Sequence, residues 1–224
     1  MKILALESSA VAASAALCED EMLLGQTYLH TGLTHSQTLL PMAAGLLEQC
    51  GLKPQDLDLI AVAAGPGSFT GLRIGVAAAK GLAWAAELPC AGCSTLEAMA
   101  WSLAGFQGEV CAAMDARRHQ VYNARFQVNG TAPHRLTPDR AIALADLVKE
   151  LEGTSVPQIV VGDGAQLCYD ALTAAGIMLL IGHQDAEEIV QDSLLWIWEN
   201  RENLIIETSL SSYLFKMIYR KALN

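Results

Sequence analysis

The sequence is short of positive charge and contains no long apolar run. Its 224 residues include 14 Lys and Arg against 24 Asp and Glu, a formal net charge of −10. A chain of this sign does not hold nucleic acid through its overall field. The most apolar window, residues 76–88, is interrupted by Lys80 and Glu87, and a spanning helix needs about 18 apolar residues in a row. Glu7 likewise breaks the apolar start that a signal peptide needs. We expect a cytoplasmic protein that does not associate with a membrane.

Cysteine and histidine are few, and their spacing does not predict a metal site. The six cysteines include one C-x-x-C pair, Cys90 and Cys93, with no second pair to complete a zinc site. His30 and His35 are five residues apart, whereas two ligands on one helix face need a spacing of four. We expect two reduced core thiols at a strand end, no metal and no other cofactor.

Recognisable catalytic motifs are also lacking. The glycine-rich segment GPGSFTGL has no lysine where a P-loop requires one. No Ser/His/Asp or Cys/His set can be assembled from the remaining polar residues. We therefore assign no catalytic residue and do not expect an enzyme.

The apolar pattern predicts an α/β fold with mixed sheets covered by helices. A first unit, residues 1–103, has strands predicted at 2–6, 10–17, 22–28, 57–64 and 89–93, and helices at 34–50, 68–87 and 95–103. A second unit, residues 104–182, has strands predicted at 109–114, 120–128 and 159–161, and helices at 142–151 and 165–175. An Asn-Gly turn is expected at residues 129–130. Residues 183–224 predict two further amphipathic helices.

The first predicted helix contains a proline and a possible capping box. Thr34 and Gln37 have the spacing at which side chains and backbone at a helix start can satisfy each other. Pro41 inside this helix would cost about 3 kcal/mol. The alternative is a helix that begins nearer Met42.

The second predicted helix carries Gly71, Gly75 and Gly81, each about 1 kcal/mol less favourable than alanine. Gly71 and Gly75 share a face, and this strip would let another backbone approach closely. A partner helix and the chain's own sheet are equally good occupants at this point. Phosphate binding by the GPGS turn at the helix N-terminus is a further possibility.

Two other turns have the composition of nucleotide-contacting loops. One follows the first strand at residues 7–9, and the other is the Gly-Asp-Gly-Ala turn at residues 162–165. At residues 115–118 an aspartate precedes two arginines, a pattern that predicts a salt bridge at a hairpin end.

Five segments together resemble the TsaB (YeaZ) family, over residues 1–180. They are MKILALESS, THSQTLLPM, AVAAGPGSFTGLRIGVAAAKGLA, STLEAMA and MDARRHQVY. The resemblance implies a two-lobed actin/Hsp70-like (ASKHA) fold in a non-catalytic scaffold or dimerisation subunit. Its partners would be a TsaD-like subunit, which performs N6-threonylcarbamoylation of adenosine 37 in tRNA, and a TsaE-like ATPase. Contact with tRNA would be only indirect, and a homodimer would form when the partner is absent. The glycoprotease-like label of such chains reflects kinship with TsaD only.

The resemblance also implies site residues by position. The partner-binding set is His35, Ser36, Leu39, Leu40, Pro41, Ser68, Phe69, Thr70, Gly71, Arg73, Ile74 and Gly75. Remnants of a degenerate nucleotide site would be Glu7, Ser8, Ser9, Gly162 and Gly164. Glu7 departs from the family, which usually has aspartate there.

The C-terminal residues 183–224 depart further, because they resemble region 2 of an extracytoplasmic-function sigma factor instead of the family's own C-terminal segment. A natural fusion and an artefact of gene prediction are both open. The alternative functions are therefore a sigma-like polymerase-binding fusion, or an ATP-dependent kinase or hydrolase of the actin/Hsp70-like class.

Overall fold

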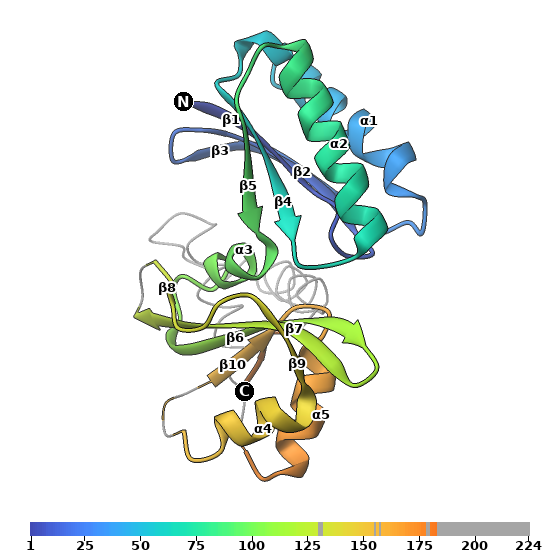
Figure 1. Cartoon of the computed structure of the whole chain (residues 1–224). Coiled ribbons are helices and arrows are strands. Elements are labelled where there is room, and N and C mark those ends of the chain that lie inside the picture. The colour runs from blue at the N-terminus through green and yellow to red at the C-terminus, as the bar shows by residue number, and fades with distance from the viewer. Residues whose placement is uncertain (130–131, 155, 157, 178–179, 183–224) are drawn as a thin grey trace, which may run out of the picture. The chain divides into compact units, whose positions relative to one another are not determined.

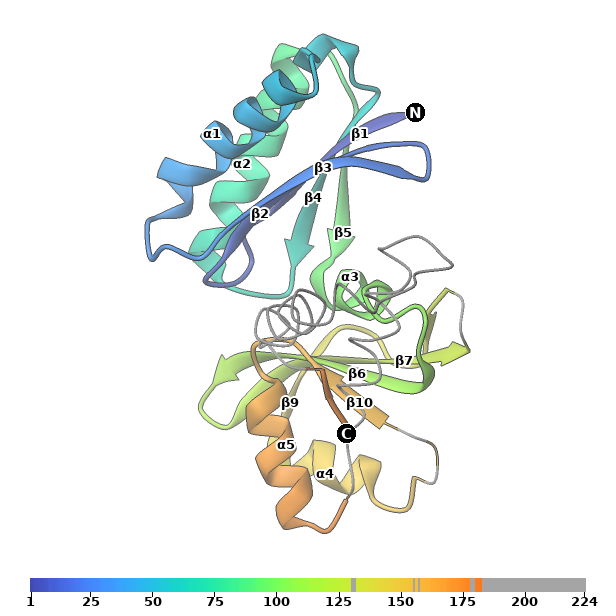
Figure 2. The same ribbon diagram turned by 180° about the vertical axis from the view of Figure 1, so that it is seen from behind.

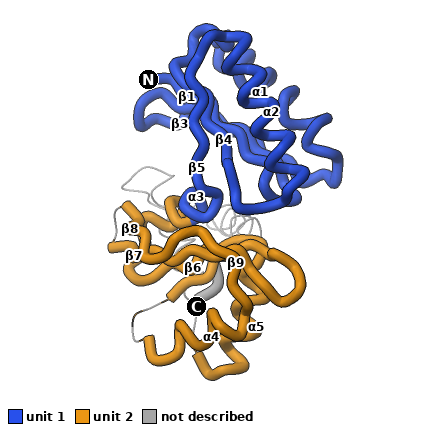
Figure 3. The backbone as a smooth tube through the Cα atoms, viewed as in Figure 1, with its two compact units in different colours: residues 1–99 blue, residues 100–224 orange. Residues whose placement is uncertain are grey.

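The structure is a computed structural model that describes residues 1–129, 132–154, 156, 158–177 and 180–182. The chain forms two compact units, Met1–Met99 and Ala100–Asn224, shown in different colours in Figure 3. The expected domain boundary after residue 103 stays a prediction. The predicted helices of residues 183–224 lie outside the described residues. No helix in the described part is long and apolar enough to cross a membrane.

Unit 1 is a five-stranded mixed sheet with two long helices. Its elements are β1 (Lys2–Glu7), β2 (Ala13–Glu19), β3 (Met22–Leu29), α1 (His35–Gln49), the short 3-10 helix η1 (Pro54–Asp56), β4 (Leu59–Gly65), α2 (Phe69–Ala85) and β5 (Cys90–Ser94), followed by α3 (Thr95–Trp101). The strand order is β3-β2-β1-β4-β5. The first three strands form an antiparallel meander, and β1, β4 and β5 are parallel.

Both long helices of unit 1 cover the same face of its sheet (Figures 1 and 2). Alternate residues of β1, among them Leu4 and Leu6, point toward the helices and are fully buried. They meet Leu39 and Leu46 of α1 and Ala79 of α2 in one apolar core. Burial of this face is the main source of stability for the unit, because apolar burial dominates the folding free energy.

α1 begins at His35 and continues through Pro41, so the alternative of a helix start near Met42 is wrong. The capping box does not form either. The Thr34 hydroxyl lies 3.0 Å from Gln37 Oε1 and accepts no backbone hydrogen bond. The burial of Leu39 and Met42 on either side of Pro41 offsets the cost of a proline within the helix.

The expectation that Cys90 and Cys93 are core thiols is wrong. β5 is an edge strand, and Cys90 and Cys93 are exposed. Cys90 pairs with Ile60 and Cys93 with Ala63, so the two thiols lie on opposite faces of the sheet. This C-x-x-C pair therefore cannot chelate one ion between its sulfurs.

Unit 2 is a second mixed sheet with two helices on one face. It contains β6 (Gln107–Arg117), β7 (Gln120–Asn129), β8 (His134–Arg135), β9 (Arg140–Ala143), α4 (Leu144–Leu151), β10 (Gln158–Val161), α5 (Ala165–Ala174) and β11 (Leu180–Gly182). The order is β11-β10-β6-β7-β8, with β9 also paired to β7. The helix predicted from residue 142 begins only at Leu144, because residues 140–143 pair with β7.

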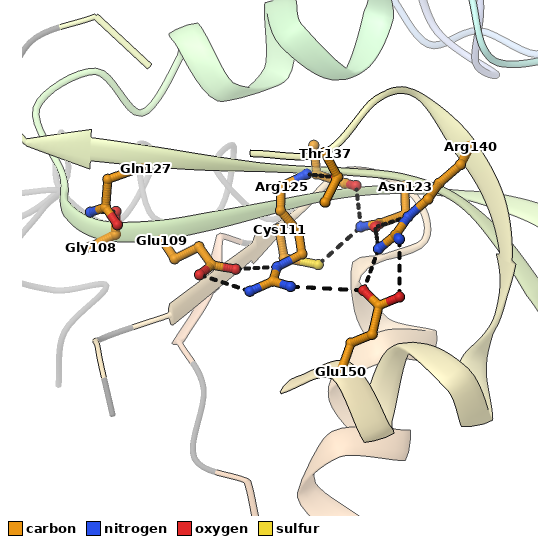
Figure 4. A network of polar contacts seen from close by, with 10 residues as sticks. Gly108, Glu109, Cys111, Asn123, Arg125, Gln127, Thr137, Arg140 and Glu150 are labelled. Atoms are coloured by element: carbon orange, nitrogen blue, oxygen red, sulfur yellow. Dashed lines mark hydrogen bonds and ion pairs between the residues drawn. The ribbon is translucent and has the colours of Figure 1, made fainter. Parts of the chain in front are cut away.

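A polar network ties β6, β7, β9 and α4 together (Figure 4). Arg125 forms a bidentate ion pair with Glu109, and Arg140 Nη2 donates to Glu150 Oε2 at 2.6 Å. Arg140 Nη2 also donates to Asn123 Oδ1 at 3.2 Å. The hydrogen bond to Glu109 raises the pKa of Arg125. Every member has a partner, as buried polar groups require, so we interpret the network as structural.

Candidate functional site

Three glycines of unit 1 hold the chain's own loop. The segment after β1 runs against the N-terminal turns of α2, where Ser68 N donates to Ser9 O at 2.7 Å and Ser8 Oγ donates to Gly71 O at 2.9 Å. A Cβ at Gly67 would lie 2.6 Å from Ser9 O. A Cβ at Gly71 would overlap Ser8 O, and one at Gly75 would overlap Ser8 Oγ. Gly67 and Gly71 are there because the Ser8–Ser9 backbone packs directly on them, and Gly75 because the Ser8 side chain does.

This packing corrects the interpretation of the glycine strip. Gly71 and Gly75 are buried against Ser8 and Val62 and offer no surface to another chain. The alternative, packing onto the chain's own sheet and loop, is what the structure shows. Leu39 must be removed from the candidate interface for the same reason, since its exposed fraction is 1%.

His35 and Glu7 also serve the loop. His35 Nε2 lies 2.8 Å from Ala10 O, so it is the protonated nitrogen of the ring. Glu7 accepts a hydrogen bond from Ser9 N. His35 Nδ1 and Ser9 Oγ are buried without a hydrogen-bond partner in the described structure. His35, predicted to bind a partner, and Glu7, predicted as part of a nucleotide-site remnant, thus both hydrogen-bond to the loop after β1.

The Gly-Asp-Gly-Ala turn of unit 2 is packed in a similar way. Gly164 N donates to Ala113 O at 3.1 Å, and a Cβ at Gly164 would lie 2.8 Å from the carbonyl carbon of Met114. Asp163 accepts from Asp115 N at 3.2 Å, and burial raises the pKa of Asp163. Gly162 has a φ of 111°, which favours glycine. In both units the glycine motif admits the chain's own backbone, and a joint nucleotide site stays a prediction.

The remaining predicted partner residues lie on or beside the outward face of α1 and α2. Ser36, Leu40, Pro41, Ser68, Phe69, Thr70 and Arg73 are exposed, and Ile74 is half-buried. The exposed fractions are 45% for Leu40 and 68% for Phe69. The Arg73 guanidinium stacks on the Phe69 ring at 4.0 Å.

Three residues of this face were missed by the analysis of the sequence or given no role. Trp84 is 86% exposed. Apart from adjacent residues and the backbone of the same helix, no atom of the described chain lies within 4 Å of where a Cβ would be at Gly45 of α1 or Gly81 of α2. Unlike Gly71, they have no packing reason within the unit, although each lowers helix stability by about 1 kcal/mol. Gly81 is three residues from Trp84, a spacing that puts both on one helix face and could have drawn attention to Gly81.

The salt bridge expected at the β6–β7 hairpin is not formed. Asp115 Oδ1 accepts from the backbone N–H of Arg117 at 2.6 Å. Within the described residues, neither Arg117 nor Arg118 is in an ion pair. The aspartate thus shapes the turn and leaves both guanidinium groups in solvent.

Known proteins match both units of the chain. A family model described as TsaD, tRNA N6-adenosine threonylcarbamoyltransferase, matches residues 30–177. The protein named tRNA threonylcarbamoyladenosine biosynthesis protein TsaB is 35% identical in Bacillus subtilis, over 75% of this chain and 73% of that protein. The Escherichia coli protein of the same name is 36% identical, over 81% of this chain and 80% of that protein. The chain belongs to the TsaB (YeaZ) family.

The solved structure of YeaZ from Pseudomonas aeruginosa agrees with this assignment. Its TM-score to this structure is 0.65 at 28% identity, over 76% of this chain and 79% of that one. The expected actin-like α/β class of the TsaB family is thereby confirmed. The family-model match ends at residue 177, so the likeness of residues 183–224 to a sigma factor gains no support from it.

Proposed function

We propose that this chain is a non-catalytic subunit in tRNA threonylcarbamoyladenosine synthesis, and that it binds a TsaD-like subunit through the outward face of α1 and α2. That pathway is the one named for its relatives. The TsaD-like subunit performs the chemistry on adenosine 37, and a TsaE-like ATPase joins the complex. Such a role places the protein in the cytoplasm with its tRNA.

The observation that carries the proposal is the exposure of Leu40 on α1 and of Phe69, Gly81 and Trp84 on α2, together with the open space at Gly45 of α1. Large exposed apolar side chains beside glycines are what close helix packing against a partner uses, because glycine lets two helix backbones approach. In the free chain the same surface would be covered by a second copy, which gives a homodimer through the same helices.

The non-catalytic role is supported by how the two glycine motifs are used. In an ATP-dependent member of the actin/Hsp70-like class, these loops would contact phosphate. Here Ser8, Ser9 and Gly164 make close contacts with the chain's own backbone instead. Calorimetry with Mg-ATP is expected to show no binding, and measurable heat of binding would favour the enzyme alternative. The polymerase-binding alternative rests on residues outside the described part.

Gly81→Leu tests the proposed face, because nothing in the unit contacts this position. We expect the variant to fold as the wild type does. The Kd of its heterodimer with the TsaD-like subunit should rise at least about tenfold, which is roughly 1.4 kcal/mol. A sizing column measures the loss of the heterodimer.

The matched control is Ala174→Leu, which adds the same side chain at an exposed position on α5 of unit 2. It should bind the partner normally. Equal binding by wild type, Gly81→Leu and the control would show that the partner docks elsewhere.

A further inference from the structure

The turn between β6 and β7 is built from residues that disfavour its backbone conformation. Arg117, Arg118 and His119 have φ values of 65°, 53° and 57°. Arg117 pairs with Gln120, so Arg118 and His119 are the two central residues of the hairpin turn. Turns with positive φ at both central positions strongly favour Asn-Gly. Arg-His here calls for a reason beyond turn formation, since strained residues concentrate at functional sites.

Backbone hydrogen bonds hold this turn in place on both sides. Arg117 N donates to Asp115 Oδ1 at 2.6 Å, and His119 O accepts from Leu144 N, the first residue of α4, at 3.0 Å. Asp115 N in turn donates to Asp163 Oδ1 at 3.2 Å. The two nearby carboxylates therefore each bind a backbone N–H, and the turn presents its side chains from a fixed frame.

The arginines of the turn differ from the other arginines of the described residues. Arg125, Arg135 and Arg140 form ion pairs with carboxylates, and Arg73 stacks on Phe69. Arg117 and Arg118 are both exposed, and within the described part of the chain their side chains form no ion pair, hydrogen bond or ring contact. In a chain with a net charge of −10, two adjacent guanidinium groups with no partner among the described residues point to an anionic ligand.

We propose that Arg117 and Arg118 bind the phosphate backbone of the tRNA. A guanidinium forms paired hydrogen bonds with phosphate oxygens, and such contacts position an RNA without reading its sequence. The overall charge of the chain is negative and does not attract RNA, so the contact with the tRNA is local. It adds to the tRNA binding that the TsaD-like partner provides. The naming of the RNA as tRNA rests on the proposed function, and the direct contact goes beyond the indirect role implied by family resemblance.

The test compares binding of a fluorescent, unmodified tRNA transcript to the full chain by anisotropy. Weak backbone contacts require protein concentrations up to the order of 100 µM and about 50 mM salt. Arg117→Gln/Arg118→Gln should weaken tRNA binding at least about fivefold. Each phosphate contact contributes about 0.7–0.9 to the slope of log K against log salt, so losing two contacts should reduce the slope by roughly 1–2.

The control Lys53→Gln/Lys149→Gln removes the same two charges from exposed sites elsewhere and should leave binding within about twofold, because the contact is local. Equal losses in both double variants would mean a general charge effect and would overturn the proposal. So would unchanged binding in the turn variant, or no binding by the wild type.

Arg118→Asn/His119→Gly controls for misfolding, because Asn-Gly is favoured in a turn with positive φ at both central positions. This variant lacks Arg118 and should therefore still bind tRNA more weakly. The turn variants should form the heterodimer normally. Loss of the heterodimer in these variants would make the turn a protein contact and overturn the RNA assignment. If neither the wild type nor any variant forms a heterodimer, the proposed function fails. The anisotropy measurement on the isolated chain still decides whether Arg117 and Arg118 bind RNA.

Discussion

Two glycines of α2, Gly71 and Gly81, differ in what a Cβ atom would meet at each position. Gly71 lies against the carbonyl of Ser8, where a methyl group cannot fit. Gly81, three helical turns further along, faces open space in the described structure. The sequence shows both as glycines on one helix, and only the position of the Ser8–Ser9 loop separates them.

Gly71→Ala should destabilise the chain by about 3 kcal/mol, because the added methyl overlaps buried backbone. Gly81→Ala should stabilise the isolated chain by about 1 kcal/mol, since alanine favours the helix and meets no neighbour. Urea denaturation of the two variants measures both changes. Changes of the same sign would mean that the two glycines have the same environment.

At the scale of elements, the β6–β7 hairpin is the clearest conflict between local preference and structure. Most strands and helices follow their apolar periodicity, so their existence could be predicted. The hairpin turn could not, because Arg-Arg-His has no turn preference of its own. Pairing of β6 with β7, together with the bonds from Asp115 and Leu144, imposes the left-handed backbone.

Arg118→Asn/His119→Gly should therefore raise the unfolding free energy by about 1–2 kcal/mol, because left-handed backbone disfavours most side chains. For a chain of this size that is a rise in Tm of roughly 2–8 °C. Differential scanning calorimetry measures it. Arg117→Gln/Arg118→Gln keeps non-glycine residues at the strained positions and should show no comparable rise.

On the scale of the whole molecule, the two proposed surfaces belong to different compact units. The partner-binding face is formed by α1 and α2 of unit 1, and the basic turn lies in unit 2. Mutational effects at separate sites without shared partners usually add.

Combining Gly81→Leu with Arg117→Gln/Arg118→Gln should thus give two independent losses. Heterodimer formation should fall as in the first variant alone, and tRNA binding by the isolated chain as in the second alone. Sizing chromatography and anisotropy measure the two losses separately. A combined loss that differs clearly from the sum would show coupling between the units.

The sequence by itself determined the α/β class, the order of most elements and the family, because periodicity, turn residues and the GPGSFTGLR segment are local signals. It could also place candidate residues on α1 and α2. It could not decide whether Gly71 and Gly75 face the chain's own loop or a partner, and it could not say that β5 is an exposed edge strand or that residues 140–143 join a sheet. Those outcomes depend on which segments, distant in sequence, pack against each residue, and burial is a property of that packing.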